Sequence, residues 1–281
     1  MESSFKRAWR IVSPIIIYLV IERIVGFTIN FYYIMGRLDE DAVWTETLEN
    51  QLYLEVYDML SKNTVLISGI VASIGILIFY RMFQKELRKR TYIIEHIGSP
   101  YLKYLYVAAI AIGFTLSVNL AINAWGLFKY NFDIAELNQI IYSESLWKQI
   151  LVIGIIVPIC EELLFRGVIY ERISQSGNTR SAMILTCILF AFFHGTWIQI
   201  IYAFFFSFLM IYAYQRCGSF MAPLCFHIIS NLSSLMLRQF PPLSTIGYSI
   251  GIVSFAIIGL LGIYKLKHQK YYRCQSKNYS N

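Results

Sequence analysis

Residues 151–172 read LVIGIIVPICEELLFRGVIYER, an apolar run that contains two adjacent glutamates and an arginine. The run is long enough to cross a bilayer, because a membrane-spanning helix needs about 20 apolar residues. A charged side chain at mid-membrane costs about 2.5–3.5 kcal/mol on insertion scales, so Glu161, Glu162 and Arg166 are expected to have a function. Pro158 loosens the helix just before the glutamates, because proline removes a backbone hydrogen bond. The run therefore predicts a membrane helix that carries a polar site.

The composition of the whole chain also indicates a membrane protein. The chain has 281 residues, of which 57% are hydrophobic and only 15% are charged, and its mean hydropathy is +0.54. Soluble domains carry about 25% charged residues. The five cysteines show no CxxC spacing, which gives no indication of a structural zinc site or a disulfide framework. These features exclude a soluble enzyme, a disordered protein and a secreted disulfide-rich scaffold.

Eight segments are apolar and long enough to be predicted as membrane spans. They are residues 11–35, 62–80, 104–127, 147–170, 181–196, 197–214, 219–238 and 246–265. The fifth and sixth form one apolar stretch, which we divide near Gly195 because a single span would be too long. We expect an all-α, polytopic membrane protein with about eight transmembrane helices. It would form one integral membrane domain over 1–281, with motif-bearing helices in 147–238 and a basic cytoplasmic tail over 265–281.

The distribution of basic residues predicts the orientation of these spans. If the N-terminus is cytoplasmic, seventeen of the 24 Lys and Arg side chains fall on the cytoplasmic side. The other side holds five, which are Arg37, Lys62, Lys129, Lys148 and Arg238. Cytoplasmic loops of membrane proteins carry the excess of Lys and Arg, so both termini are predicted to lie inside. The first outer loop is acidic, and we interpret it as a solvated loop with an amphipathic helix.

Two more predicted spans carry polar side chains among apolar neighbours. His194 lies at the end of the fifth span, and the seventh contains His227 and Asn231 one helical turn apart. At a rise of about 1.5 Å per residue, these side chains and Glu161 lie about 12–20 Å from the cytoplasmic ends of their helices. The sequence therefore predicts that three helices place polar groups around one enclosed, hydrated site.

Helical spacing distinguishes the two adjacent glutamates. Glu162 and Arg166 are four residues apart and share a helix face, so they are expected to form an ion pair. Glu161 lies about 100° further round the helix and faces another direction. A carboxylate near two imidazoles in a medium of low dielectric is suited to activating water. Glu162 is therefore predicted to be structural, and Glu161 to be available for chemistry.

The polar residues also form three motifs in a recognisable order. Residues 161–166 match EExxxR, residues 190–194 match FxxxH and residues 227–231 match HxxxN. In this order on separate membrane helices, they resemble the CPBP intramembrane protease family, also called CAAX protease or Abi. This family includes the Ras-converting CAAX endopeptidase. The resemblance implies eight helices around a polar cavity that opens toward the cytosol and the bilayer, and hydrolysis of peptide bonds in or near the membrane.

The resemblance also implies roles for the motif residues. Glu161 would be the general base that activates the attacking water, and His194 would help to hold that water. His227 and Asn231 would stabilise the oxyanion of the tetrahedral intermediate. The substrate would be a membrane-associated or prenylated-type peptide or protein in contact with the lipids of the cell membrane. No nucleic-acid partner is expected, because the basic residues lie in short blocks between apolar runs.

Two further roles follow from the resemblance, and one question stays open. Glu162 would support the site or contact the water, and Arg166 would orient the carboxylates. Glu161, His194 and His227 are candidate zinc ligands, because Glu and His bind Zn²⁺ with an open fourth position in catalytic sites. The alternative is a metal-free mechanism, which we favour. HExxH is absent and the ligands would come from three helices, so spacing along the sequence does not decide between the two.

Two other functions remain compatible with the sequence. A non-catalytic membrane protein of the bacteriocin self-immunity type would use the same cavity to bind a peptide. A small transporter would use the glutamate and histidines as an intramembrane relay, although no internal repeat supports this hypothesis. The intact motif set favours the peptidase.

Overall fold

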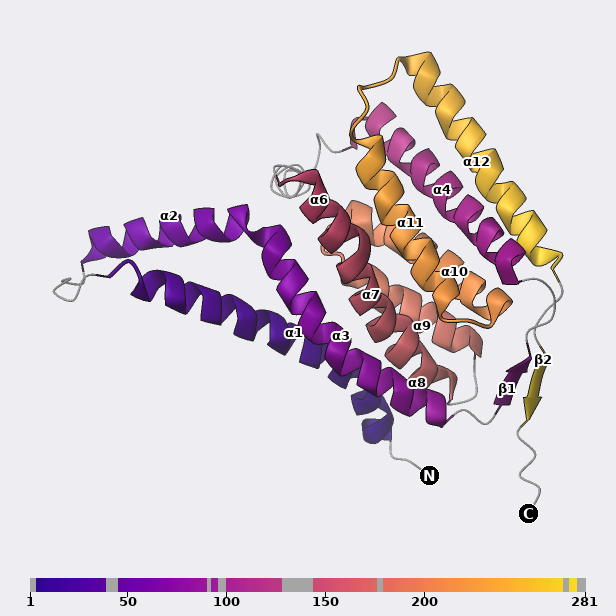
Figure 1. The fold of residues 1–281 in the computed structure, drawn as a ribbon, viewed down its shortest axis with the longest axis horizontal. Coiled ribbons are helices and arrows are strands. Elements are labelled where there is room, and N and C mark those ends of the chain that lie inside the picture. Colours follow the sequence, from indigo (N-terminus) through magenta and orange to yellow (C-terminus); the bar gives the residue numbers. More distant parts are fainter. Residues whose placement is uncertain are drawn as a thin grey trace.

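The computed structural model describes seven parts of the chain, and these parts are almost entirely helical (Figure 1). They are residues 4–38, 45–89, 92–95, 100–127, 144–175, 179–269 and 273–276. The long helices are α1 (Ser4–Met35), α2 (Glu46–Lys62), α3 (Thr64–Arg88), α4 (Pro100–Ala124), α9 (Thr179–Phe192), α10 (Trp197–Cys217), α11 (Met221–Leu237) and α12 (Thr245–Lys267).

Between α4 and α9 lies one continuous helical rod that changes its winding several times. It consists of α6 (Leu146–Lys148), the π-helix η2 (Gln149–Ile156), α7 (Val157–Glu162), the π-helix η3 (Leu163–Tyr170) and α8 (Glu171–Ser174). We refer to it as the central rod. In Figure 1 it lies between α3 on one side and α11 on the other. The central rod is the helix that the sequence predicted over residues 147–170.

Among the described residues, five helices are long and apolar enough to cross a membrane. They are Phe5–Met35, Thr64–Arg88, Tyr101–Ala124, Trp197–Cys217 and Thr245–Lys267. The shorter helices α9 and α11 are also apolar. Every predicted span thus coincides with a helix of the described residues. The apolar part of this membrane protein is therefore helical throughout the described residues. The count of eight spans and their orientation stay predictions.

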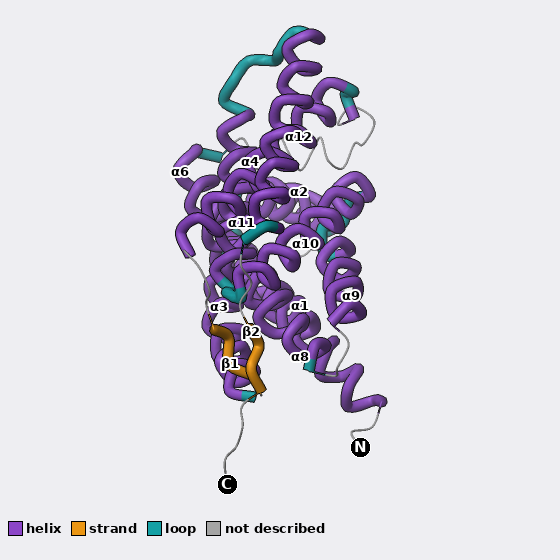
Figure 2. Tube along the Cα trace, turned by 90° about the vertical axis from the view of Figure 1, so that its right-hand side faces the viewer, coloured by secondary structure: helices purple, strands orange, loops and turns teal. Residues whose placement is uncertain are grey.

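Two features outside the spans bear on the sequence-based expectations. The amphipathic helix expected in the first outer loop is α2, whereas the acidic residues 39–44 lie outside the described residues. The expected all-α class is confirmed, and beside the helices one short strand pair is described, in which β1 (Tyr92–Glu95) pairs antiparallel with β2 (Arg273–Ser276) (Figure 2). Such short strands show no periodicity, so pairing between distant segments was not predictable. The rest of the predicted tail beyond residue 269 lies outside the described residues.

The central rod packs closely against α3, and this contact places the site. A Cβ atom on Gly75 would lie 2.5 Å from the Sγ atom of Cys160, so only glycine fits at this crossing. A Cβ on Gly69 would likewise press on Val152, at 3.1 Å. The two glycines let α3 approach the half of the central rod that carries the glutamates. Phe165 and other fully buried side chains of the rod then form the centre of the main hydrophobic cluster.

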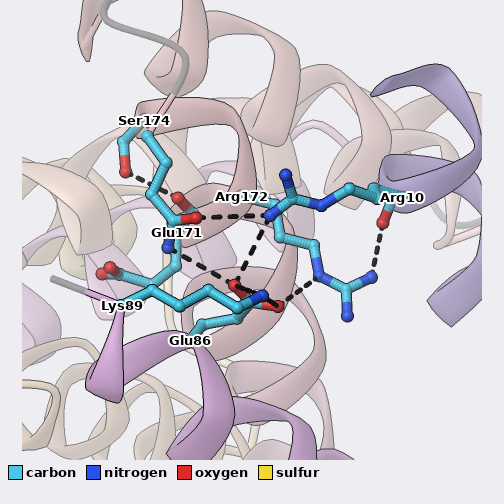
Figure 3. Close-up of polar contacts among 7 residues, drawn as sticks. Arg10, Glu86, Lys89, Glu171, Arg172 and Ser174 are labelled. Carbon is cyan, nitrogen blue, oxygen red and sulfur yellow. Dashed lines mark hydrogen bonds and ion pairs between the residues drawn. The ribbon is translucent and has the colours of Figure 1, made fainter. Parts of the chain in front are cut away.

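A buried carboxylate joins three helices at one end of the molecule (Figure 3). Glu86 at the end of α3 is 1% exposed, and it pairs with Arg172 of α8 at 3.0 Å and with Lys89 at 2.9 Å. Arg10 of α1 lies 3.6 Å from the same carboxylate, and its backbone carbonyl accepts a hydrogen bond from Arg172. The beginning of α1, the end of α3 and α8 therefore lie together.

Other contacts extend this grouping to the remaining helices. Tyr104 near the start of α4 donates a hydrogen bond to Ser219 in the turn between α10 and α11. The β1–β2 pair brings the segment after α12 to the segment after α3. The described segments that were predicted to be cytoplasmic, and that carry most of the basic residues, thus lie at one end of the molecule. We call this the basic end.

We predict that Glu86→Gln lowers the free energy of unfolding by about 1–3 kcal/mol. The substitution removes the charge of a buried carboxylate and so weakens the hydrogen bonds that this group accepts. The measurement is thermal or denaturant unfolding of the purified protein in detergent. The matched control is Asp58→Asn, whose ion pair with Lys62 is exposed to solvent and is expected to contribute nothing measurable. Equal stability of the Glu86 variant and the wild type would contradict this role of Glu86.

Candidate active site

The winding of the central rod explains how two adjacent glutamates come to face different surroundings. Pro158 has no N–H group, and the N–H of Val157 bonds to the carbonyl of Val152, five residues earlier. The wide turns of η2 and η3 thus flank the α-helical turns that carry Glu161 and Glu162. Insertions of π-helix are frequent at functional sites because they redirect side chains.

Glu162 forms a fully buried ion pair, as its spacing from Arg166 predicted. Nη1 of Arg166 donates to Oε1 of Glu162 at 2.8 Å, and both side chains are 0% exposed. Nη2 of Arg166 donates to Oγ of Ser207 on α10, also at 2.8 Å. The guanidinium lies over the ring of Phe190, with Cζ 4.3 Å from the ring centroid. The arginine is therefore held from the central rod, α9 and α10 together.

The same carboxylate holds the histidine of α11. Nδ1 of His227 lies 2.8 Å from Oε1 of Glu162, and Nε2 lies 3.7 Å from Oε2 of Glu161. Because an ionised carboxylate only accepts hydrogen bonds, Nδ1 carries the proton of this contact. The contact therefore turns Nε2 toward Glu161. This link between Glu162 and His227 was not predicted from the sequence.

Glu161 faces a cavity, in contrast to its neighbour. Its side chain is 15% exposed, and it lines a cavity of about 320 Å³. The cavity lies between the central rod, α4, α9, α10 and α11, and His194, His227 and Asn231 also line it. The structure thus brings all four side chains that were predicted to share one site to a single cavity.

His194 occupies a turn rather than a helix, which corrects the expectation from the sequence. Helix α9 ends at Phe192, and Gly195 has a φ of +78°, a left-handed conformation that favours glycine. This glycine divides the apolar stretch into α9 and α10, where the sequence suggested a turn. Nδ1 of His194 lies 2.9 Å from the carbonyl oxygen of Phe190, and a donated hydrogen bond there leaves Nε2 as an acceptor.

Asn231 makes a hydrogen bond between helices and also lines the cavity. Its Nδ2 donates a hydrogen bond to the carbonyl oxygen of Ile153 at 2.8 Å, which ties α11 to the π-helical part of the central rod. A side-chain amide has two N–H groups and one carbonyl oxygen. One N–H and Oδ1 are therefore left for a ligand in the cavity.

Two members of the site were not identified as such in advance. Ser207 lies within the apolar sequence FFFSF. A single hydroxyl among phenylalanines is the only sign in the sequence that a polar partner lies nearby. The ring of Phe190 contacts Arg166 and packs edge-on against His227, with centroids 5.8 Å apart. Phe190 therefore separates the buried charge from the cavity, a role that the FxxxH spacing alone does not reveal.

The predicted zinc ligands do not form a ligand cluster in the structure. Among the described residues, no group of three or more His, Cys, Asp or Glu side chains lies close enough together to hold a metal ion. We therefore derive no chemical step through a metal from this geometry.

Fold and site together define a polytopic membrane protein with a carboxylate–histidine cavity enclosed among its helices. Residues 143–233 match the family described as Type II CAAX prenyl endopeptidase Rce1-like. The matched segment contains all six predicted site residues, and the match supports the resemblance to the CPBP, or CAAX protease, family that the motifs indicated. Comparison with curated proteins and with solved structures gave no match.

We predict that Ser207→Ala lowers the free energy of unfolding by about 1–3 kcal/mol, because it removes a hydrogen-bond partner from a buried charge. Unfolding in detergent measures the change. The control is Ser73→Ala on α3, since the Ser73 hydroxyl bonds only to the carbonyl of Gly69 in its own helix. If both variants unfold like the wild type, Ser207 does not support Arg166.

Proposed function

We propose that this protein is an intramembrane endopeptidase in which Glu161 activates water to hydrolyse a peptide bond. The observation that carries the proposal is that Glu161 is the one carboxylate among the described residues lining the cavity, with both histidines beside it. Its neighbour Glu162 is fully buried, and Oε1 of Glu162 accepts hydrogen bonds from Arg166 and His227. The family match supports protease activity in general.

The first step is attack of water on the carbonyl carbon of the substrate. Glu161 accepts a proton from this water as general base while the new C–O bond forms. Nε2 of His194 accepts the second hydrogen of the water and orients it. His194 is suited to this role because Nδ1 is fixed on a backbone carbonyl, so the ring can present Nε2 to the cavity.

The second requirement is stabilisation of the oxyanion that forms in this attack. The remaining N–H of Asn231 lines the cavity near Glu161, and Nε2 of His227 becomes a second donor there when the imidazole takes up a proton. Donors that are already oriented before the reaction stabilise developing charge without reorganisation. Glu162 orients His227, and Ile153 orients Asn231. When the C–N bond breaks, Glu161 gives its proton to the departing amine.

The substrates that fit this site are membrane-associated or prenylated-type peptides and proteins in the cell membrane. An extended peptide segment must reach Glu161 inside the apolar bundle, which requires a substrate that is held at or in the bilayer. The mechanism uses only side chains of this chain and routes no step through a metal ion.

We predict that Glu161→Gln lowers kcat for peptide cleavage by about 10²–10⁴-fold, because it removes a general base and keeps the shape of the side chain. The measurement compares membrane peptides from cells that carry the wild type or the variant, followed by assays of the purified proteins on any peptide that shortens only with the wild type. The thermal unfolding of Glu161→Gln should match that of the wild type.

The matched control is Glu22→Gln, which alters an exposed intramembrane glutamate on α1, away from the cavity. This control is expected to cleave like the wild type. Full activity of Glu161→Gln would refute the role of Glu161. Equal biological protection by the wild type and Glu161→Gln, with no peptide shortened by either, would instead support the non-catalytic immunity protein.

A further inference from the structure

Helix α1 carries two adjacent charged residues in the middle of its apolar sequence. These residues are Glu22 and Arg23, and both side chains are exposed at the surface of the protein. The apolar runs on either side, residues 11–21 and 24–35, are each too short to cross a bilayer, which takes about 20 residues. Any membrane span formed by α1 therefore contains this pair within the hydrocarbon layer.

Neither charge is ion-paired or hydrogen-bonded in the part of the chain that the structure describes. No such contact joins Glu22 or Arg23 to another described residue. The two side chains do not satisfy each other, because adjacent residues of a helix point about 100° apart. Charged side chains within a membrane almost always pair or face the interior of a protein. The pair therefore indicates that α1 contacts a second membrane helix.

Exposure to lipid alone does not distinguish α1 from the other outer helices. In the most apolar window of α1 only 17% of the residues are buried, and in that of α12 only 11% are buried. Residues 246–264 of α12 contain no charged residue, so its outer surface suits lipid. The outer surface of α1 differs because of its charges. Figure 1 shows α1 at the edge of the bundle, where a further helix has room to pack.

The exposed side of α1 also has a seven-residue spacing. Val12, Leu19 and Gly26 lie along one line of the helix, and Val12 and Leu19 are 43% and 44% exposed. A Cβ atom on Gly26 would meet no packed neighbour within 4 Å, so another backbone can come close at this point. Glu22 and Arg23 flank this line on opposite sides. We call these five residues the α1 face.

A second copy of the chain supplies the charges that the α1 face requires. Two copies in one membrane have the same orientation, so a two-fold axis along the membrane normal places their α1 helices parallel. In a parallel pair, residues on opposite flanks of the contact line meet, as they do in a coiled coil. Glu22 of each copy then faces Arg23 of the other at the same depth. Both charges of both copies are neutralised by two identical ion pairs.

We propose that the α1 face is the interface of a homodimer within the membrane, joined by two reciprocal ion pairs between Glu22 and Arg23. This inference goes beyond the proposed peptidase function and does not depend on it. Among the described residues, none from α1 lines the cavity, so each copy contains its own site. Paired and separate copies are therefore expected to cleave alike.

Charge reversal tests the interface. Energy transfer is measured between donor-labelled and acceptor-labelled copies of the full chain in phosphatidylcholine liposomes, over a range of protein-to-lipid ratios. Glu22→Arg and Arg23→Glu each place like charges opposite each other, and each is expected to raise the dissociation constant of the dimer more than about hundredfold. An equimolar mixture of the two variants has opposite charges at both contacts and is expected to restore the transfer.

The matched control is Asp58→Arg, which reverses an exposed charge on α2 outside the α1 face and is expected to associate like the wild type. Two results would overturn the proposal. One is a wild type that shows no transfer above random collisions at any ratio, which would leave the α1 face to a different membrane protein. The other is equal transfer in the wild type, in both single reversals and in their mixture.

A second test keeps the native charges, so it also holds if the reversed variants fail to insert. The five native cysteines are replaced, and Leu19→Cys is compared with Ile24→Cys. Ile24 is 59% exposed and lies about 140° round the helix from Leu19. We expect oxidation with copper phenanthroline to link two copies through Leu19→Cys and not through Ile24→Cys. No link through Leu19→Cys, or equal links through both positions, would overturn the α1 face as the interface.

Discussion

The buried pair of Arg166 and Glu162 is the interaction on which the rest of the site depends. Two charges removed from water are tolerated only when they are paired and hydrogen-bonded. Arg166 meets this condition through Glu162 and Ser207, and Glu162 through Arg166 and His227. The central rod, α10 and α11 are thus joined at one point. This network fixes the ring of His227 and leaves Glu161 facing the cavity.

The parts of the structure that were predictable from the sequence are those that depend on neighbours along one helix. The apolar runs predicted the helices, and the four-residue spacing predicted the Glu162–Arg166 pair. Contacts between helices leave no such pattern, so the bond from Arg166 to Ser207 was not predictable. His194 was predicted to lie on a helix because its neighbours are apolar. The helix instead ends two residues before His194, where the chain turns through the left-handed conformation of Gly195.

The basic end of the molecule is held by ion pairs, whereas the cavity lies elsewhere in the bundle. Around Glu86 at the basic end, ion pairs hold α1, α3 and α8 together, and no large opening is required there. Further along the bundle, α4, α10 and α11 line the cavity with the central rod. Glu161 faces this cavity, whereas Glu162 is buried in the network behind it.

The most direct test of the central claim is a double-mutant cycle on the free energy of unfolding, with Arg166→Met, Glu162→Gln and the double variant. Removing one partner of a buried pair costs about 3–5 kcal/mol, because the other charge is left unpaired. We expect the double variant to be less destabilised than the sum of the two single variants, by more than 1 kcal/mol. Additive effects of the two substitutions would show that the pair does not hold the site together.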